Sequence, residues 1–353
     1  MEKLRSESLN QIAFFASLCL FLSVLEYAIP KPLPFMRLGL ANLPILLSVK
    51  KMPVRGTLLL VLLKVLLQAT VSGTLFSYVF LFSFSGSLAS ALAILVLYRI
   101  SGCGRAVSNL GLSLAGALAN NMAQLFCARF VLFGTNTRYI APLLLSAGFV
   151  TAVALGIFAN LFEAKSQWFS DYSDKFSSTV SIPPQGPSQR STIIERIRFS
   201  VFFLAMIAML FAKKLGILWT FVLVFFMLSL IRRKGKVKIL PSLVIVLSVT
   251  FFSLLSPSGK VLATLGTWRI TAGALADGLR RSGVLVGMTF ASQNMVGRNT
   301  VLPGRAGRLV TQVFMLFDEL TSQRISLRLG QSIAAIDRRL TEIYANYLQK
   351  IVL

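Results

Sequence analysis

Long apolar stretches, separated by short polar or basic connections, repeat along nearly the whole chain. Many of them approach or exceed the roughly 18 residues that a helix needs to cross a bilayer. In the N-terminal part the pattern predicts helices at residues 12–29, 38–49, 56–71, 74–98, 107–132 and 139–162. In the C-terminal part it predicts helices at 198–212, 215–230, 239–256 and 270–296. We therefore expect an all-α, polytopic membrane protein with about ten transmembrane helices in two bundles.

A polar stretch with prolines at positions 183, 184 and 187 separates the two sets of apolar runs. Proline-containing polar stretches of this kind are typical of linkers. The sequence therefore predicts a six-helix membrane domain at 1–163, a linker at 164–194 and a second membrane domain at 195–353.

Beyond Arg298 the apolar stretches become shorter and alternate with arginines. In the last segment, apolar residues from Ile333 to Ile351 recur at helical spacing while charged residues occupy other faces. We expect amphipathic helices in this region, lying at the cytoplasmic membrane surface or against a partner.

Composition supports the membrane assignment, because 55% of the residues are hydrophobic and only 14% are charged. The net charge of +24 raises the alternative of nucleic acid as a partner. The lysines and arginines lie mainly between the apolar runs, however, where the positive-inside bias explains them, so we expect no nucleic acid. The densest basic cluster, at 232–238, favours a multi-pass protein of the inner (cytoplasmic) membrane with a cytoplasmic N-terminus. No cleavage site closes the first apolar run, so we expect it to be an uncleaved helix.

The chain offers little catalytic chemistry. It has no histidine and only twelve acidic residues, of which Asp318 and Glu319 are the only adjacent pair. Its three cysteines lack metal-like spacing, and it has no phosphate-binding loop. We therefore expect no cofactor, no metal and no catalytic residues, and any ATP hydrolysis would come from a separate subunit.

Polar residues inside apolar helices are costly in lipid and are therefore the functional candidates. The main ones are Glu26, Lys64, Asn120, Asn121, Gln124 and Arg129. Asn120 and Gln124 are four residues apart, so they lie on one helix face, where they contact either a ligand or a neighbouring helix. For Lys64 the pattern favours snorkelling or pairing with Glu26 over substrate contact. The small residues Ser83, Gly86, Ser87 and Ser90 are typical of a packing surface.

The connection at 30–42 contains three prolines and Arg37. Because proline restricts the backbone, this segment is either a stiff lid over a polar pocket or an anchor at the lipid headgroups. Arg37 would then meet an anionic group of a ligand or of a lipid.

Several short motifs resemble the Gx transporter family, which is also called heptaprenyl diphosphate synthase component I. They are Leu25-Glu26-Tyr27, Arg37-Leu38-Gly39-Leu40-Ala41-Asn42, Phe82-Ser83-Phe84-Ser85-Gly86-Ser87 and Leu112-Ser113-Leu114-Ala115-Gly116-Ala117, with Gln124. The resemblance covers about residues 12–163 and implies a six-helix substrate-binding component of an energy-coupling factor transporter, which captures vitamin-like molecules. Lys64 departs from the arginine that the resemblance implies. On this hypothesis we expect the small-molecule substrate to contact Arg37, Asn42, Asn120 and Gln124.

The C-terminal part is similar to the transmembrane coupling component of the same transporters. The similarity rests on Ile270-Thr271, Ala274-Leu275, Gly278-Leu279-Arg280, Leu302-Pro303-Gly304 and the run from Leu309 to Leu320. It implies that separate ATPase subunits bind a cytoplasmic arginine motif. The chain lacks the Ala-Arg-Gly triplet after Leu320, and Arg324 and Arg328 are the nearest candidates.

Two other functions remain open. One is a non-catalytic membrane partner in isoprenoid or quinone metabolism, which the second family name suggests. The other is a structural membrane subunit without a ligand, in which the polar residues only join helices.

Overall fold

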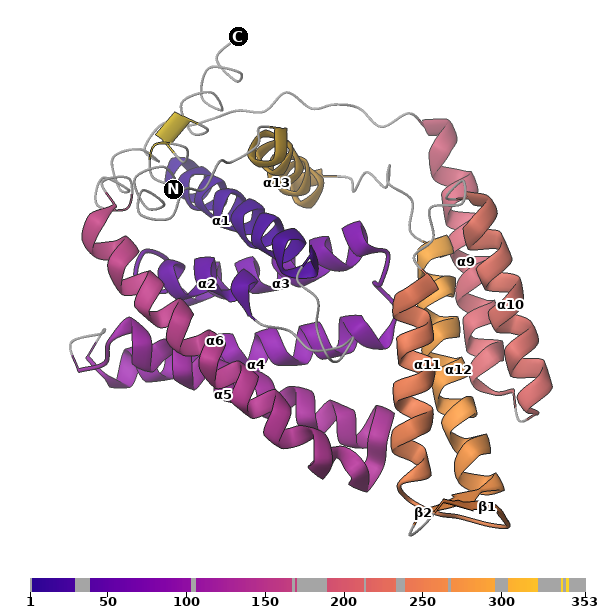
Figure 1. Ribbon diagram of the computed structural model, residues 1–353. Helices are drawn as coiled ribbons and strands as arrows, with labels where there is room; N and C mark the ends of the chain where they lie inside the picture. The colour runs from indigo at the N-terminus through magenta and orange to yellow at the C-terminus, as the bar shows by residue number, and fades with distance from the viewer. Residues whose placement is uncertain are drawn as a thin grey trace.

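The computed structural model describes residues 2–28, 39–102, 106–166, 169, 189–212, 214–232, 239–265, 268–295, 304–322, 338 and 341–342. The described part contains eleven α-helices in two groups that lie side by side (Figure 1). The first group contains α1 (Glu2–Ala28), η1 (Leu40–Asn42), α2 (Leu43–Ser48), α3 (Val54–Ser72), α4 (Tyr78–Ile100), α5 (Asn109–Cys127), η2 (Ala128–Phe133), η3 (Gly134–Asn136) and α6 (Thr137–Lys165). The second contains α9 (Gln189–Leu210), α10 (Leu215–Arg232), α11 (Ile239–Leu254), β1 (Val261–Leu265), β2 (Trp268–Thr271) and α12 (Ala272–Met295), and α13 (Gly304–Ser322) follows it.

Most helices lie close to the predicted ranges, but α1 begins at Glu2 and not at residue 12, and α9 begins at Gln189, inside the predicted linker, and not at residue 198. Two further differences are instructive. The predicted helix at 38–49 is a 3-10 turn followed by the short helix α2, whose Pro44 lies in the first turn, where a missing N–H costs little. The predicted helix at 270–296 begins at Ala272, because the preceding residues form β2 of an antiparallel hairpin with β1. The hairpin was not predicted, since both strands are short and lie between two much stronger helical signals.

The prediction of about ten spans is not confirmed. Among the described residues, four helices are long and apolar enough to cross a membrane: Val54–Ser72, Tyr78–Ile100, Thr137–Lys165 and Leu215–Arg232. Three shorter apolar helices accompany them: Leu9–Val24, Ile197–Leu210 and Ile239–Leu254. α5 is not in this set, because its buried amide side chains lower its mean hydropathy.

Helix α13 packs against α1 and not against the α9–α12 group (Figure 1). Its buried residues Leu309, Val313, Leu316 and Leu320 recur at helical spacing and join the same apolar cluster as Phe14 of α1. The predicted amphipathic character of the C-terminal region is therefore seen in α13, and the partner that it covers is the first helix of the chain. Most of the segment from Ile333 to Ile351 lies outside the described residues.

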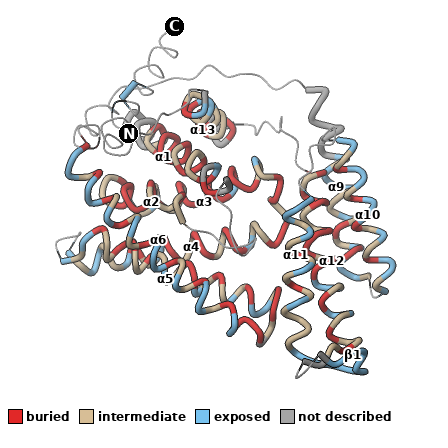
Figure 2. Tube along the Cα trace, in the orientation of Figure 1, coloured by how far each residue is buried: buried red, intermediate tan, exposed pale blue. Residues whose placement is uncertain are grey.

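The two groups meet where α5 connects to α6. Asn136 Nδ2 donates a 2.7 Å hydrogen bond to Phe252 O in α11, and Ser256 Oγ donates a 3.0 Å bond to Asn136 Oδ1. The rings of Phe133 and Phe252 pack edge to face with centroids 5.1 Å apart. Many residues of α12 are buried, whereas much of α10 and α11 is exposed (Figure 2). In a membrane protein, these exposed apolar faces are the surfaces expected to face lipid.

Candidate functional site

Lys64 is a buried cation in the middle of α3, with only 4% of its surface exposed. Its Nζ donates hydrogen bonds to Asn42 Oδ1 of η1 and, at 3.2 Å, to Ser87 Oγ of α4. Three elements therefore meet at one ammonium group. A buried ammonium needs such partners, because an unsolvated charge is expensive.

Two small cavities flank this point. One, of about 10 Å³, is lined by Lys64 together with Glu26, Gly39, Ala41, Asn42, Gln68, Ser83, Ser87 and Asn120. The other, of about 30 Å³, shares Gly39, Asn42 and Asn120 and extends between α4, α5 and α6. A single water needs roughly 10–15 Å³, so together the cavities admit only a few water-sized groups. A vitamin-sized ligand is far larger, and its binding requires the surrounding helices to separate.

Glu26 of α1 is 2% exposed and lines the same cavity as Lys64. A carboxylate and an ammonium in one cavity reduce the cost of burying either charge. The sequence-based expectation that these two residues are associated is consistent with this placement.

Beyond its first residue, Asn109, the polar side chains of α5 divide into two kinds. Ser113 Oγ donates a 2.8 Å bond to Ala152 O, and Asn121 Nδ2 donates a 3.1 Å bond to Leu144 O, so both are tied to the backbone of α6. Asn120 makes only a 3.4 Å contact to Asn121 Oδ1. Gln124 is 0% exposed, and within the described part of the chain neither its Nε2 nor its Oε1 has a hydrogen-bond partner. Interhelical bonding thus accounts for Ser113 and Asn121 but leaves the hydrogen-bonding capacity of Asn120 and Gln124 largely unused.

Glycine makes room for these amides. A Cβ at Gly86 of α4 would lie 2.3 Å from Asn120 Oδ1 and 3.3 Å from Gln124 Nε2. The small-residue stripe of α4 is therefore a packing surface, as predicted, and also the wall against which the two amides are placed. Ser87 of the same stripe bonds Lys64, which the packing interpretation did not anticipate.

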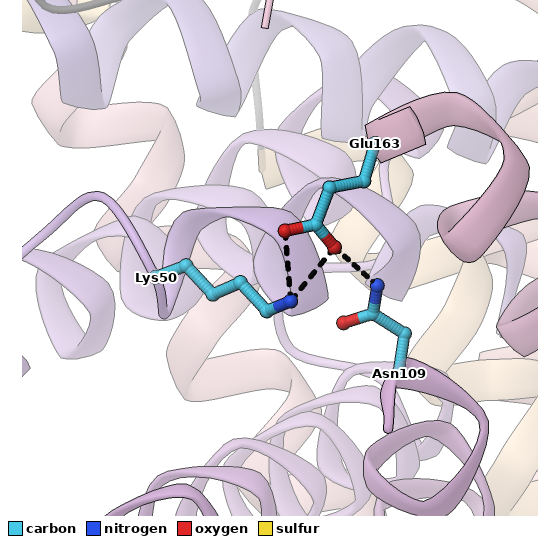
Figure 3. Close-up of polar contacts among 3 residues, drawn as sticks. All are labelled: Lys50, Asn109 and Glu163. Atoms are coloured by element: carbon cyan, nitrogen blue, oxygen red, sulfur yellow. Dashed lines mark hydrogen bonds and ion pairs between the residues drawn. The ribbon is translucent and has the colours of Figure 1, made fainter. Parts of the chain in front are cut away.

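A second polar cluster joins the ends of α2, α5 and α6. Lys50 Nζ contacts both carboxylate oxygens of Glu163, at 2.9 and 2.7 Å, and Asn109 Nδ2 donates a 2.6 Å bond to Glu163 Oε2 (Figure 3). Close by, Lys51 Nζ lies 4.8 Å from the ring centroid of Phe169. This cluster fixes the helix ends and is separate from the cavities, whose lining contains none of its three members.

The structure brings together Asn42 and Asn120 at the cavities and places Gln124 one helical turn beyond Asn120. The other predicted site residues, Arg37, Arg324 and Arg328, lie outside the described residues, as does the proposed lid at 30–37. Arg129 is exposed and lies away from the cavities.

The sequence interpretation missed Gln68 and Ser87 as cavity residues. Gln68 follows Lys64 by four positions, so helical spacing from the buried cation of α3 would have pointed to it. Ser87 offered no such signal, because its role depends on how α4 packs against α3.

The groups available for recognition at the site are amides, serine hydroxyls, the Lys64 ammonium and the Glu26 carboxylate. Within the described ranges, no three His, Cys, Asp or Glu side chains gather closely enough to hold a metal ion. That the chain is not an enzyme and takes no cofactor stays a prediction.

The spans and the buried polar cluster define the chain as a multi-pass helical membrane protein. Residues 15–162 match the family described as Heptaprenyl diphosphate synthase component I. Residues 194–297 match a Domain of unknown function (DUF8519). Neither curated proteins nor solved structures match the chain.

Proposed function

We propose that the chain is the membrane component of an energy-coupling factor type importer. Its N-terminal group of helices binds a small, vitamin-like molecule or a precursor, and its C-terminal group couples to separate ATPase subunits. In this proposal, the protein lies in the inner (cytoplasmic) membrane, and its N-terminus lies in the cytoplasm.

The observation that carries this proposal is the unused hydrogen-bonding capacity beside the cavities. Among the described residues, neither amide atom of the fully buried Gln124 has a hydrogen-bond partner, and the neighbouring Asn120 makes one long bond, of 3.4 Å, to Asn121. An unsatisfied buried polar group costs about 1–3 kcal/mol, so an unpartnered amide at Gln124 favours a site that a ligand fills part of the time. A ligand with its own donors and acceptors would recover that cost.

The packing of α13 supports the coupling part of the proposal. This helix follows the C-terminal group in sequence yet lies on α1, whose Glu26 lines the ligand cavity. A movement of the C-terminal region could therefore be transmitted through the packed helices α13 and α1 to the cavity. The predicted ATPase contacts Arg324 and Arg328 come directly after α13 in sequence.

The family name supports a second candidate. A domain described as component I of heptaprenyl diphosphate synthase fits a non-catalytic membrane partner of a soluble prenyl synthase, acting in isoprenoid or quinone metabolism.

Purification of the full chain from its own membranes in mild detergent tests the two candidates. A co-purifying pair of ATPase subunits supports import, whereas a co-purifying soluble prenyl synthase contradicts it and supports the second candidate. A third outcome is that neither protein co-purifies but the chain retains a small molecule. That outcome supports ligand binding and contradicts coupling to ATPase subunits.

A further inference from the structure

An open groove of about 630 Å³ lies where α5 passes into α6. Its walls are Met122, Leu125, Phe126, Thr137 and Ala141, together with Gly134, Arg129 and Arg138. The aromatic wall is extended by Phe130, whose ring centroid lies 4.6 Å from that of Phe126. The groove is thus mainly apolar, with two cations at the helix connection.

The backbone of this connection is unusual and creates the groove. Residues Ala128–Phe133 form a π-helix, which widens the end of α5. Gly134 follows with φ of 57° and ψ of −133°, a conformation that residues with a side chain rarely adopt. The chain can therefore turn back into α6 while leaving open space between the two helices.

Positive charge gathers around the same turn. Arg129 and Arg138 line the groove and are exposed. Arg138 Nη2 donates a 2.8 Å bond to Tyr139 Oη and stacks on that ring, which orients the guanidinium while leaving its other N–H donors available. Arg281 of α12 donates a 3.2 Å bond to Leu132 O beside the groove. Among the described residues that line the groove, none is acidic.

We propose that this groove binds an anionic phospholipid. Guanidinium groups bind phosphate through several charge-assisted hydrogen bonds, and Arg129 and Arg138 provide two of them at a helix end, where lipid headgroups lie. The apolar walls along α5 and α6 fit an acyl chain running from the phosphate into the membrane. Arg281 adds positive charge from the second helix group, so the lipid would also strengthen the contact between the groups. This site is independent of the cavities at Lys64 and of the proposed transport function.

The test is native mass spectrometry of the full chain in detergent, titrated with phosphatidylglycerol or with phosphatidylcholine of the same acyl chains. We expect retention of phosphatidylglycerol and little retention of the zwitterionic lipid. Arg129→Gln and Arg138→Gln should each lower the affinity for phosphatidylglycerol by roughly tenfold, since each removes charge-assisted bonds. Arg99→Gln, at the exposed end of α4 and outside the groove, is the matched control and should leave retention unchanged.

Folding is checked by the melting temperature of each variant in lipid-free detergent, which should equal that of the wild type. Equal retention of both lipids by the wild-type chain would overturn the proposal. So would equal losses in the Arg99→Gln control and the groove variants, because the arginines would then act only as general interfacial anchors. If a groove variant melts early, Phe126→Ala, which removes an exposed wall, replaces it and should also reduce retention.

Discussion

Gln312 of α13 donates a 3.1 Å hydrogen bond to Asn10 of α1, and both side chains are buried. The bond joins residues 302 positions apart and lies within the apolar contact of the two helices. In the proposed importer, this contact joins two regions. One is the C-terminal region that binds the ATPases, and the other is α1, whose Glu26 lines the ligand cavity.

The Asn10–Gln312 bond should contribute to the docking of α13. Gln312→Ala leaves the Asn10 side chain buried without this partner, so we expect it to destabilise the protein by about 1–2 kcal/mol. The double change Asn10→Ala, Gln312→Ala should cost less than the sum of the two single changes. Thermal unfolding in detergent gives the three values, and strict additivity would show that the two side chains do not interact.

Gly86 should be essential for placing the α5 amides. In Gly86→Ala, the new methyl group would lie 2.3 Å from Asn120 Oδ1, so the amide must move. We expect a loss of about 1–3 kcal/mol of stability, the usual cost of overpacking, and weaker ligand retention. The control is Gly216→Ala in α10, where a Cβ meets nothing within 4 Å. A Gly86→Ala protein as stable as the control would contradict the described packing of α4 on α5.

Lys64 should matter for stability through its charge. Lys64→Met removes the bonds to Asn42 and Ser87 and leaves Glu26 in the cavity without that cation. Since hydrogen bonds to charged groups contribute about 1.5–3 kcal/mol, we expect a clear fall in the melting temperature. Arg55→Met, an exposed cation at the start of the same helix, is the control and should change it little. Equal changes in melting temperature for the two substitutions would mean that the buried charge of Lys64 does not affect stability.

The Lys50–Glu163–Asn109 cluster should respond to salt. The side chains of Lys50 and Glu163 are 24% and 32% exposed, so screening weakens their attraction. We expect Glu163→Gln to cost about 1 kcal/mol at low ionic strength and less in 1 M salt, because the wild type loses part of the same interaction there. A Glu163→Gln effect that is unchanged by salt would assign its role to packing or to the neutral bond with Asn109.

The helices of this protein were predictable because a span needs a long apolar run, and such runs are visible in any one sequence. The polar residues of α5 were also recognisable, since amides stand out against an apolar background. Which of them are tied to α6 was not, because Asn120 and Asn121 differ by one position and only the packing of α6 decides which of the two faces a backbone carbonyl.

Other features depended on contacts that no local pattern encodes. The docking of α13 on α1 joins the two ends of the chain, and amphipathic periodicity shows that such a helix has a partner without saying which one. The hairpin of β1 and β2 is short enough for its alternating pattern to be lost beside the helices α11 and α12. The groove at Gly134 lies at a π-helical turn, which no apolar or polar pattern along the chain predicted.

The most direct test of the central claim is mass spectrometry of small molecules retained by the full chain after purification in detergent. We expect one retained species, which is largely lost in Gln124→Leu and in Asn120→Leu, because these changes remove the amide donors and acceptors beside the cavities. Retention should survive Ser146→Ala, because Ser146 is exposed on α6 and is not among the residues that line either cavity. If the wild-type chain and both leucine variants carry the same molecules in the same amounts, these amides are not the binding site.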